Sequence, residues 1–183
     1  MDLYNKLSKK DRIKLIEKAG EKRFTLSFYK YELIKNLEIF RNFLFVQFNS
    51  IDVLGRIYIA NEGINAQLSL PAKNIYLLKK ILDEISFLKN VRLNIAIEHD
   101  NQSFLKLKIK IRDKIVADGL GNDEYDLKNN GIHVNAGEFN ELLNDKNTVA
   151  IDMRNHYESE IGHFEGANLP YVDILRESLP IIS

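Results

Sequence analysis

The sequence predicts an α+β domain with the element order β-α-β-β-α-β, followed by a shorter α/β segment. Several short stretches alternate apolar and polar residues, which is typical of strands with one buried face, and others repeat apolar residues at helical spacing. The charge also changes sign along the chain: residues 1–115 hold 22 Lys and Arg against 13 Asp and Glu, and residues 116–183 hold 4 against 13. We therefore divide the chain into an N-terminal helix (1–21), an α+β domain (22–115), a linker rich in Gly, Asn and Asp (116–131) and an α/β segment (132–183).

The first predicted helix covers residues 8–19. Ser8 followed by Asp11 resembles a capping box, and Gly20 is a plausible residue for the left-handed turn that ends a helix. Residues 24–31 then alternate, with Phe24, Leu26 and Phe28 on one face of a predicted strand.

A helix with a wide apolar face is predicted at 37–48, and two strands at 54–61 and 64–70. Asn61, Glu62 and Gly63 connect the strands, and a glycine in last place suits a loop residue with positive φ. Pro71 is expected to open the next helix, because a first-turn residue needs no N–H donor. Its apolar stripe comprises Ile75, Leu78, Ile81, Leu82, Ile85 and Leu88.

A strand at 91–97 completes the order, with Val91, Leu93, Ile95 and Ile97 expected to point inward. This is the ferredoxin-like arrangement, an antiparallel sheet with two helices on one face. The other sheet face is therefore available for some other contact.

One further strand, at 104–112, carries the sharpest charge pattern. Leu105, Leu107, Ile109 and Ile111 alternate with Lys106, Lys108, Lys110 and Arg112. Cations on alternate strand residues lie roughly 6.6 Å apart, near the spacing of phosphates on a single strand of nucleic acid. A solvated edge strand protected by lysines explains the same pattern. On composition, the basic part could meet a polyanion such as RNA, or it could simply attract the acidic part.

Composition excludes several classes. The chain has no Cys, so disulfides, thiolate catalysis and Cys-ligated zinc are excluded for these 183 residues. We find no apolar run long enough to cross a membrane and no secretory signal, and we expect a cytoplasmic protein without membrane contact.

The acidic segment opens with a helix at 137–143, capped by Asn135 with Glu138. Residues 148–152 form an apolar run that predicts a buried parallel strand, and a further helix is expected around 172–179. A parallel sheet needs more strands than this segment supplies, so we expect an incomplete domain.

Residues 150–167 resemble the first signature of rhodanese-like domains: an apolar strand, Asp-x-Arg, an acidic residue after an aromatic one, then Gly-His and Gly-Ala. The matching positions are Asp152, Arg154, Glu158, Gly162, His163 and Gly166. Asp152 and Arg154 could form a catalytic pair, but we favour a charge-assisted hydrogen bond that braces the loop. A metal site using His156 and His163 is the less favoured alternative.

The rhodanese resemblance implies a cysteine nucleophile in a later loop, expected beyond Ser183. No catalytic residue is therefore expected within these residues, and the chain alone is expected to be inactive. The incomplete domain could also contact another copy of the chain, by domain swapping or in a homo-oligomer.

Four segments of the basic part resemble bacterial tRNA uridine hydroxylases, a group that contains a rhodanese domain: residues 27–31, 55–67, 92–96 and 110–119. The resemblance implies an acylphosphatase-like N-terminal domain, tRNA as partner, and oxygen-dependent 5-hydroxylation of the wobble uridine. Molecular oxygen would be a co-substrate, and no metal, haem or flavin motif is visible.

An enzyme acting on an anticodon base must hold the RNA backbone and expose one base. We expect cations to contact phosphates and Tyr29 or Tyr31 to stack on a base, although both tyrosines could serve sheet packing instead. The candidate cations are Arg56, Lys106, Lys108, Lys110, Arg112 and Lys114. Two other functions remain open: a rhodanese-type sulfurtransferase and a non-catalytic RNA-binding module.

Overall fold

The computed structural model describes residues 7–97, 102–116 and 131–182. The chain forms two compact units, Met1–Val116 and Ala117–Ser183. The predicted linker lies largely outside the described residues, as does most of the loop that precedes the basic strand.

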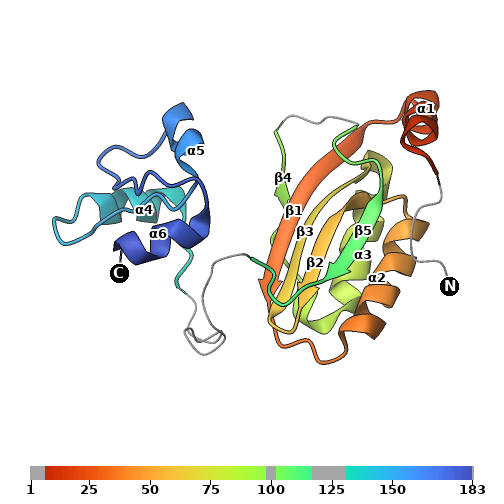
Figure 1. Ribbon diagram of the computed structural model, residues 1–183, viewed down its shortest axis with the longest axis horizontal. Coiled ribbons are helices and arrows are strands. Elements are labelled where there is room, and N and C mark those ends of the chain that lie inside the picture. The colour runs from red at the N-terminus through yellow and green to blue at the C-terminus, as the bar shows by residue number, and fades with distance from the viewer. Residues whose placement is uncertain (1–6, 98–101, 117–130, 183) are drawn as a thin grey trace. The chain divides into compact units, whose positions relative to one another are not determined.

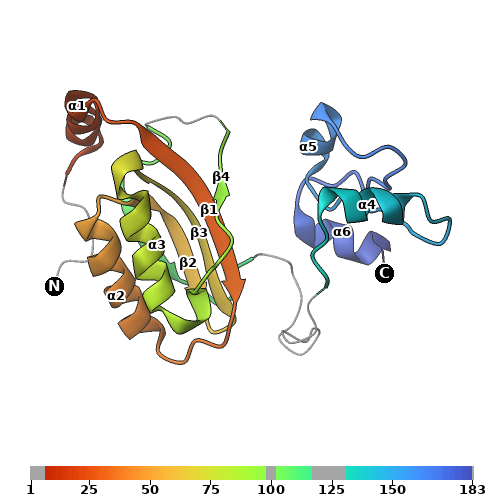
Figure 2. The same cartoon turned by 180° about the vertical axis from the view of Figure 1, so that it is seen from behind.

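The first unit is a five-stranded mixed sheet covered on one face by two helices (Figures 1 and 2). Its helices are α1 (Lys9–Ala19), α2 (Leu37–Ser50) and α3 (Ile75–Glu84), with short 3₁₀ turns at Ala72–Asn74 and Ser86–Leu88. Its strands are β1 (Arg23–Tyr31), β2 (Leu54–Ala60), β3 (Gly63–Pro71), β4 (Asn94–Ile95) and β5 (Leu107–Ile111). The strand order is β4-β1-β3-β2-β5, so the predicted β-α-β-β-α-β order forms an antiparallel sheet. β5 extends this sheet by pairing with β2 in the parallel direction, at the edge opposite β4.

The core lies between the sheet and the two covering helices. Leu26 and Phe28 of β1 are buried there, as the alternation predicts, together with Leu44 and Phe48 of α2. Because neighbouring strand residues point to opposite faces, burying this set turns Ser27 and Tyr29 to the other side of the sheet.

Two glycines lie where the backbone of a neighbouring strand comes too close to leave room for a side chain. The loop between β2 and β3 is Asn61 and Glu62 only, because Gly63 already pairs with Ala60. Gly63 has φ 150°, and a Cβ there would lie 2.2 Å from the carbonyl oxygen of Lys30. Gly55 is similarly restricted, since its Cβ would lie 2.4 Å from the carbonyl oxygen of Gln67.

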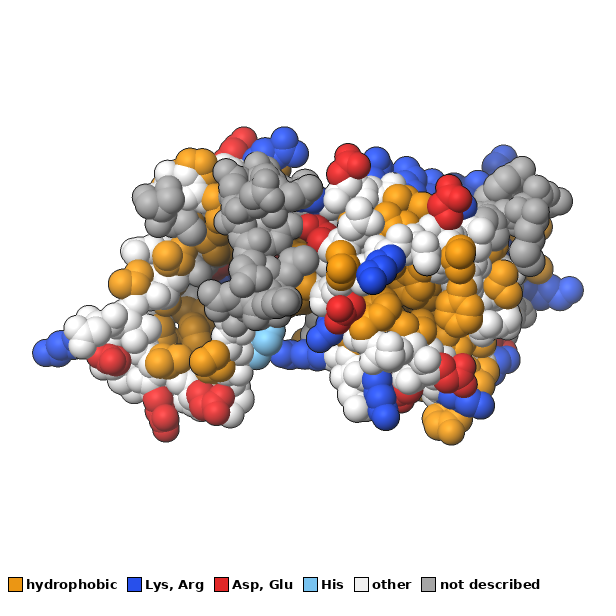
Figure 3. Space-filling model, turned by 90° about the horizontal axis from the view of Figure 1, so that it is seen from below, with side chains coloured by type: hydrophobic (Ala, Val, Ile, Leu, Met, Phe, Trp, Pro, Cys, Tyr) orange, Lys and Arg blue, Asp and Glu red, His pale blue; other side chains and the backbone are white. Residues whose placement is uncertain are grey.

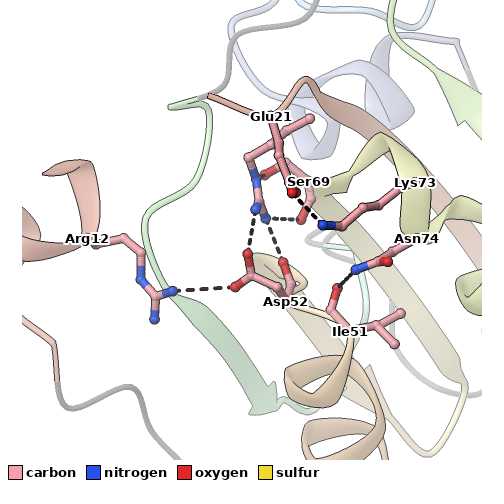
Figure 4. A network of polar contacts seen from close by, with 8 residues as sticks. Arg12, Glu21, Ile51, Asp52, Ser69, Lys73 and Asn74 are labelled. Atoms are coloured by element: carbon pink, nitrogen blue, oxygen red, sulfur yellow. Dashed lines mark hydrogen bonds and ion pairs between the residues drawn. The ribbon is translucent and has the colours of Figure 1, made fainter. Parts of the chain in front are cut away.

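Helix α1 begins and ends as predicted. The Ser8 side chain accepts a hydrogen bond from the backbone N–H of Asp11, and Gly20 ends the helix in the left-handed conformation. Arg12 of α1 lies 3.4 Å from the carboxylate of Asp52 in the turn before β2 (Figure 4). The helix is thereby tied to the domain by a contact between distant parts of the chain.

Three expectations about the first unit need correction. Pro71 ends β3, and the predicted helix divides into a 3₁₀ turn, α3, and a second 3₁₀ turn, because Ile85 takes an extended conformation.

Only Asn94 and Ile95 of the strand predicted at 91–97 pair with β1. Ile95 is 46% exposed and Ile97 fully exposed, because the chain leaves the sheet after Ala96. The strand predicted at 104–112 is shorter, at Leu107–Ile111.

The second unit contains α4 (Ala136–Leu143), α5 (His156–Ile161) and α6 (Leu175–Ile182). The capping box of Asn135 and Glu138 is present, whereas α5 was not predicted and α6 extends past Pro180. The buried strand predicted at 148–152 is wrong. Within the described part of this unit, Ile151 makes one isolated parallel bridge to Asn168, and Val149 is 67% exposed.

Hydrophobic side chains are accordingly visible on the surface of the second unit (Figure 3). A parallel strand is buried only when neighbouring strands and covering helices surround it, and the described residues of this unit provide one bridge partner. In the described parts of both units, no helix has the length and apolar character needed to cross a bilayer.

Candidate nucleic-acid interface

The sheet face opposite α2 and α3, here called the open face, faces the viewer in Figure 1. Strand alternation and register place the following side chains on it: Thr25, Ser27, Tyr29 and Tyr31 of β1, Asn65 and Gln67 of β3, Arg56 and Tyr58 of β2, Asn94 of β4, and Lys108 and Lys110 of β5. This set comes from all five strands of the sheet, and it contains no Asp or Glu. The open face is therefore polar, aromatic and positively charged.

The basic residues of the last strand lie along the edge of the sheet. Lys106, Lys108, Lys110 and Arg112 are all exposed, while Leu107 between them is buried. Lys106 and Arg112 lie just outside β5 but continue its alternation and its backbone hydrogen bonds to β2, through Gly55 N–H and Ile59 C=O. Lys114 lies beyond the strand, is only partly exposed and has partners of its own.

The parallel pairing of β2 and β5 adds Arg56 to this basic edge. Arg56 pairs with Lys108 and Tyr58 pairs with Lys110, so each pair occupies the same face. Two cations held side by side repel each other, and a bound polyanion would relieve that repulsion.

Aromatic side chains lie beside the cations. Tyr29 is 50% exposed, and its ring meets the partly buried ring of Tyr31 edge-on, with centroids 6.4 Å apart. The guanidinium of Arg112 lies 5.6 Å from the ring centre of Tyr58. Tyr58 was not among our candidates, although its alternation with Ile57 and Ile59 could have identified it.

Sequence reasoning also missed the amide side chains of this face. Ser27 pairs with Gln67 on one side and Asn94 on the other, so the three form one row across β4, β1 and β3, here called the amide row. Asn65, two residues before Gln67 on β3, donates instead to the backbone oxygen of Ile115 at 3.2 Å. The strand register, which brings these residues together, cannot be read from the sequence.

The residues of the second unit that match the rhodanese signature form a compact loop. The guanidinium of Arg154 donates from Nε to Asp152 Oδ1 at 2.8 Å and from Nη2 to the carbonyl oxygen of Gly162 at 2.6 Å. The hydrogen bonds that Arg154 donates to Asp152, together with the positive charge of Arg154, lower the pKa of the Asp152 carboxyl to about 2. The side-chain hydrogen bond to Asp152 also raises the pKa of Arg154.

Other residues of the signature position the loop backbone. Glu158 accepts from the backbone N–H of Asn155 and so caps α5. His163 Nδ1 lies 2.9 Å from the carbonyl oxygen of Ser159, and Gly166 takes φ 76°. All these partners lie within the loop itself.

The described residues contain no group of three or more His, Asp or Glu side chains that could hold a metal ion. His156 contacts Asp173 at 3.0 Å and Glu160 at 3.5 Å, and His163 contacts a backbone carbonyl. The two histidines therefore have separate partners.

Comparisons with known proteins give a consistent result. Residues 23–115 match the family model described as the UPF0176 acylphosphatase like domain. The chain is similar to proteins named tRNA uridine(34) hydroxylase, with 48% identity to that of Leptospira interrogans, 43% to that of Photorhabdus laumondii and 44% to that of Escherichia coli strain SE11. These matches cover 98%, 99% and 97% of this chain but 49%, 52% and 51% of the relatives. The chain thus spans about half the length of the curated relatives it matches.

Proposed function

Because the chain belongs to the family defined by the UPF0176 acylphosphatase-like domain, we propose that it is the RNA-binding part of a tRNA uridine 5-hydroxylase acting on the wobble uridine. The observation that carries this proposal is the identity of 42% to 48% with tRNA uridine(34) hydroxylases along almost the whole chain. Molecular oxygen is the proposed co-substrate.

In this proposal, the first unit holds tRNA on its open face. Phosphates lie along the basic edge formed by Arg56, Lys106, Lys108, Lys110 and Arg112, where their negative charge offsets the mutual repulsion of the cations. Tyr29 supplies a half-exposed ring on which a base stacks. Tyr31 supports the ring of Tyr29, and Lys114 has a lesser role because it is partly buried.

The second unit is proposed to be part of a rhodanese-like domain, with the loop around Asp152 and Arg154 as a structural element. The basis is the signature at residues 150–167 and the internal hydrogen bonds of that loop. The chain has no cysteine, so we propose that the 183 residues alone do not hydroxylate tRNA. Contact with a second copy through this unit belongs to the same proposal.

Binding is tested by titrating unmodified tRNA at several salt concentrations. The triple substitution of Lys106, Lys108 and Lys110 by Glu is expected to abolish measurable binding at moderate salt. When Lys106, Lys108 and Lys110 are replaced one at a time, each lost phosphate contact should reduce the slope of log affinity against log salt by about 0.7–0.9. The matched control replaces Lys9, Lys10 and Lys14 of α1 by Glu, an equal charge change on exposed residues of another surface. Equal losses in both variants would contradict a role for the open face.

Catalysis is tested separately. The chain is incubated with unmodified tRNA under oxygen, and 5-hydroxyuridine is sought by mass spectrometry. We expect no product. Product formed by this cysteine-free chain would contradict the proposed inactivity and would direct attention to residues described here.

A further inference from the structure

A shallow depression of about 370 Å³ lies on the open face at the edge opposite β5. Its lining includes Ser27, Gln67 and Asn94, the amide row, and Phe104 from the segment that precedes β5. We infer that this depression binds a single unstacked nucleobase of single-stranded RNA, an inference that rests on the RNA-binding role proposed above.

The chemistry of the amide row suits the edge of a base. Gln67 and Asn94 are both exposed, and each side-chain amide offers donors and an acceptor. The two residues flank Ser27 in register, so their amide groups converge on one depression from neighbouring strands. Paired donors and acceptors of this kind can read the Watson–Crick edge of a base that has left its stack.

Phe104 provides a different kind of contact. It is partly buried and lines the same depression, so part of its ring is available to a ligand. Stacking on an aromatic ring is sequence-tolerant because every base has a π face. Phe104 is therefore expected to contribute affinity, and the amide row to contribute preference among bases.

The charge distribution identifies the ligand as part of a polyanion. The depression contains no charged side chain, but the row that crosses it continues through Arg56 of β2 to Lys108 of β5. β1 and β5 are three strands apart, about 14 Å at the usual strand separation. That distance, with the reach of a lysine side chain, lets a base lie over the amide row while neighbouring phosphates contact the basic edge.

The test measures fluorescence anisotropy of the 183-residue chain with labelled oligouridylate, oligocytidylate and oligoadenylate. The oligomers have about ten nucleotides, within the site size of single-strand-binding folds. The chain should bind one of the three most tightly. Gln67→Ala and Asn94→Ala should each weaken that complex about fivefold, the value of one hydrogen bond, and change the weakest complex less than twofold.

Phe104→Ala has a different expected signature: a loss of about tenfold for all three oligomers, with their order unchanged. The matched control is Asn49→Ala, an exposed amide on α2, which covers the opposite face of the sheet. The Asn49→Ala variant should bind all three oligomers with unchanged affinity. Gln67→Glu, which keeps the side-chain length but removes both amide donors, should weaken the preferred complex at least as much as alanine does.

The outcomes separate this inference from the proposed function. A chain without base preference, or a preference that survives both amide substitutions, overturns the base site. If reversing the charge of Lys106, Lys108 and Lys110 still abolishes binding, the RNA-binding role stands. A chain that binds none of the oligomers and no tRNA overturns both.

Discussion

Arg23 Nη1 donates a hydrogen bond to Asp52 Oδ2 at 2.8 Å, and Arg23 itself is only 3% exposed (Figure 4 shows Asp52 and its surroundings). The same guanidinium donates to the backbone oxygens of Asp52 and Ser69, at 2.6 and 3.1 Å. The carboxylate of Asp52 also forms an ion pair with Arg12 of α1. The backbone of Asp52 has φ 55°, a left-handed conformation. One carboxylate in a tight turn thus joins α1, β1 and the start of β2.

The substitution Asp52→Asn should destabilise the first unit. Asparagine tolerates the left-handed conformation, so the change removes the charge with little backbone strain. We expect a loss of about 1–2 kcal/mol in the free energy of unfolding, toward the lower end for hydrogen bonds to charged groups, because the carboxylate is half exposed. Urea denaturation measures it, with Asp113→Asn, an exposed carboxylate, as the control. An equal effect of both variants would exclude the network as the cause.

Gly55→Ala should cost more stability than Gly20→Ala. A Cβ on Gly55 meets the backbone of β3 at 2.4 Å, so two central strands must separate. A Cβ on Gly20 meets nothing within 4 Å. Gly20→Ala should therefore lower the stability by about 1 kcal/mol, through the left-handed conformation alone. Thermal melts of the two variants give the order, and the reverse order would contradict the tight packing of β2 on β3.

Lys108→Gln should slightly stabilise the protein while weakening its binding to RNA. Lys108 lies opposite Arg56 in the β2–β5 register, and like charges in that position destabilise a sheet by about 0.2–1 kcal/mol. The gain in melting temperature should shrink as salt is added, because salt screens exposed charges. Lys89→Gln, which removes an exposed cation outside the sheet, is the control. A loss of stability in Lys108→Gln would mean that repulsion between Lys108 and Arg56 does not destabilise the sheet.

The ion pair of Asp152 and Arg154 should make the stability of the second unit depend on pH. The pKa of Asp152, about 2, lies below the value of 3.8 for an unperturbed carboxyl. The folded state therefore binds the proton more weakly than the unfolded state does. This contribution to stability is present above pH 3.8 and is lost as the pH falls toward 2.

Carbon-detected NMR titration of the Asp152 carboxyl measures this directly. Arg154→Gln should return the titration toward that of an ordinary carboxyl. Arg154→Lys should restore it only in part, since an ammonium cannot reproduce the forked contact with Asp152 and Gly162. Arg176→Gln, an exposed cation on α6, should leave the titration unchanged. An unchanged midpoint in Arg154→Gln would disprove the assigned cause.

Much of the first unit can be derived from the sequence, because local patterns determine its elements. The alternation of Phe24, Leu26 and Phe28 predicts β1 and its buried face, and Ser8 and Gly20 predict the two ends of α1. The run of cations after Phe104 likewise predicts an exposed edge strand. These features depend on the periodicity of a few neighbouring residues, which a sequence states directly.

Tertiary structure alone decided the rest. Whether Ile97 or Ile151 is buried depends on what covers it, and apolar character alone gave the wrong answer at both positions. The amide row and the pairing of Arg56 with Lys108 depend on strand register, which joins residues as far apart in the sequence as Ser27 and Asn94. Sequence therefore determined which residues are polar and which strand faces they occupy. The sheet determined which of them share one surface, because hydrogen bonding between distant strands sets register and packing against α2 and α3 leaves only the opposite face open.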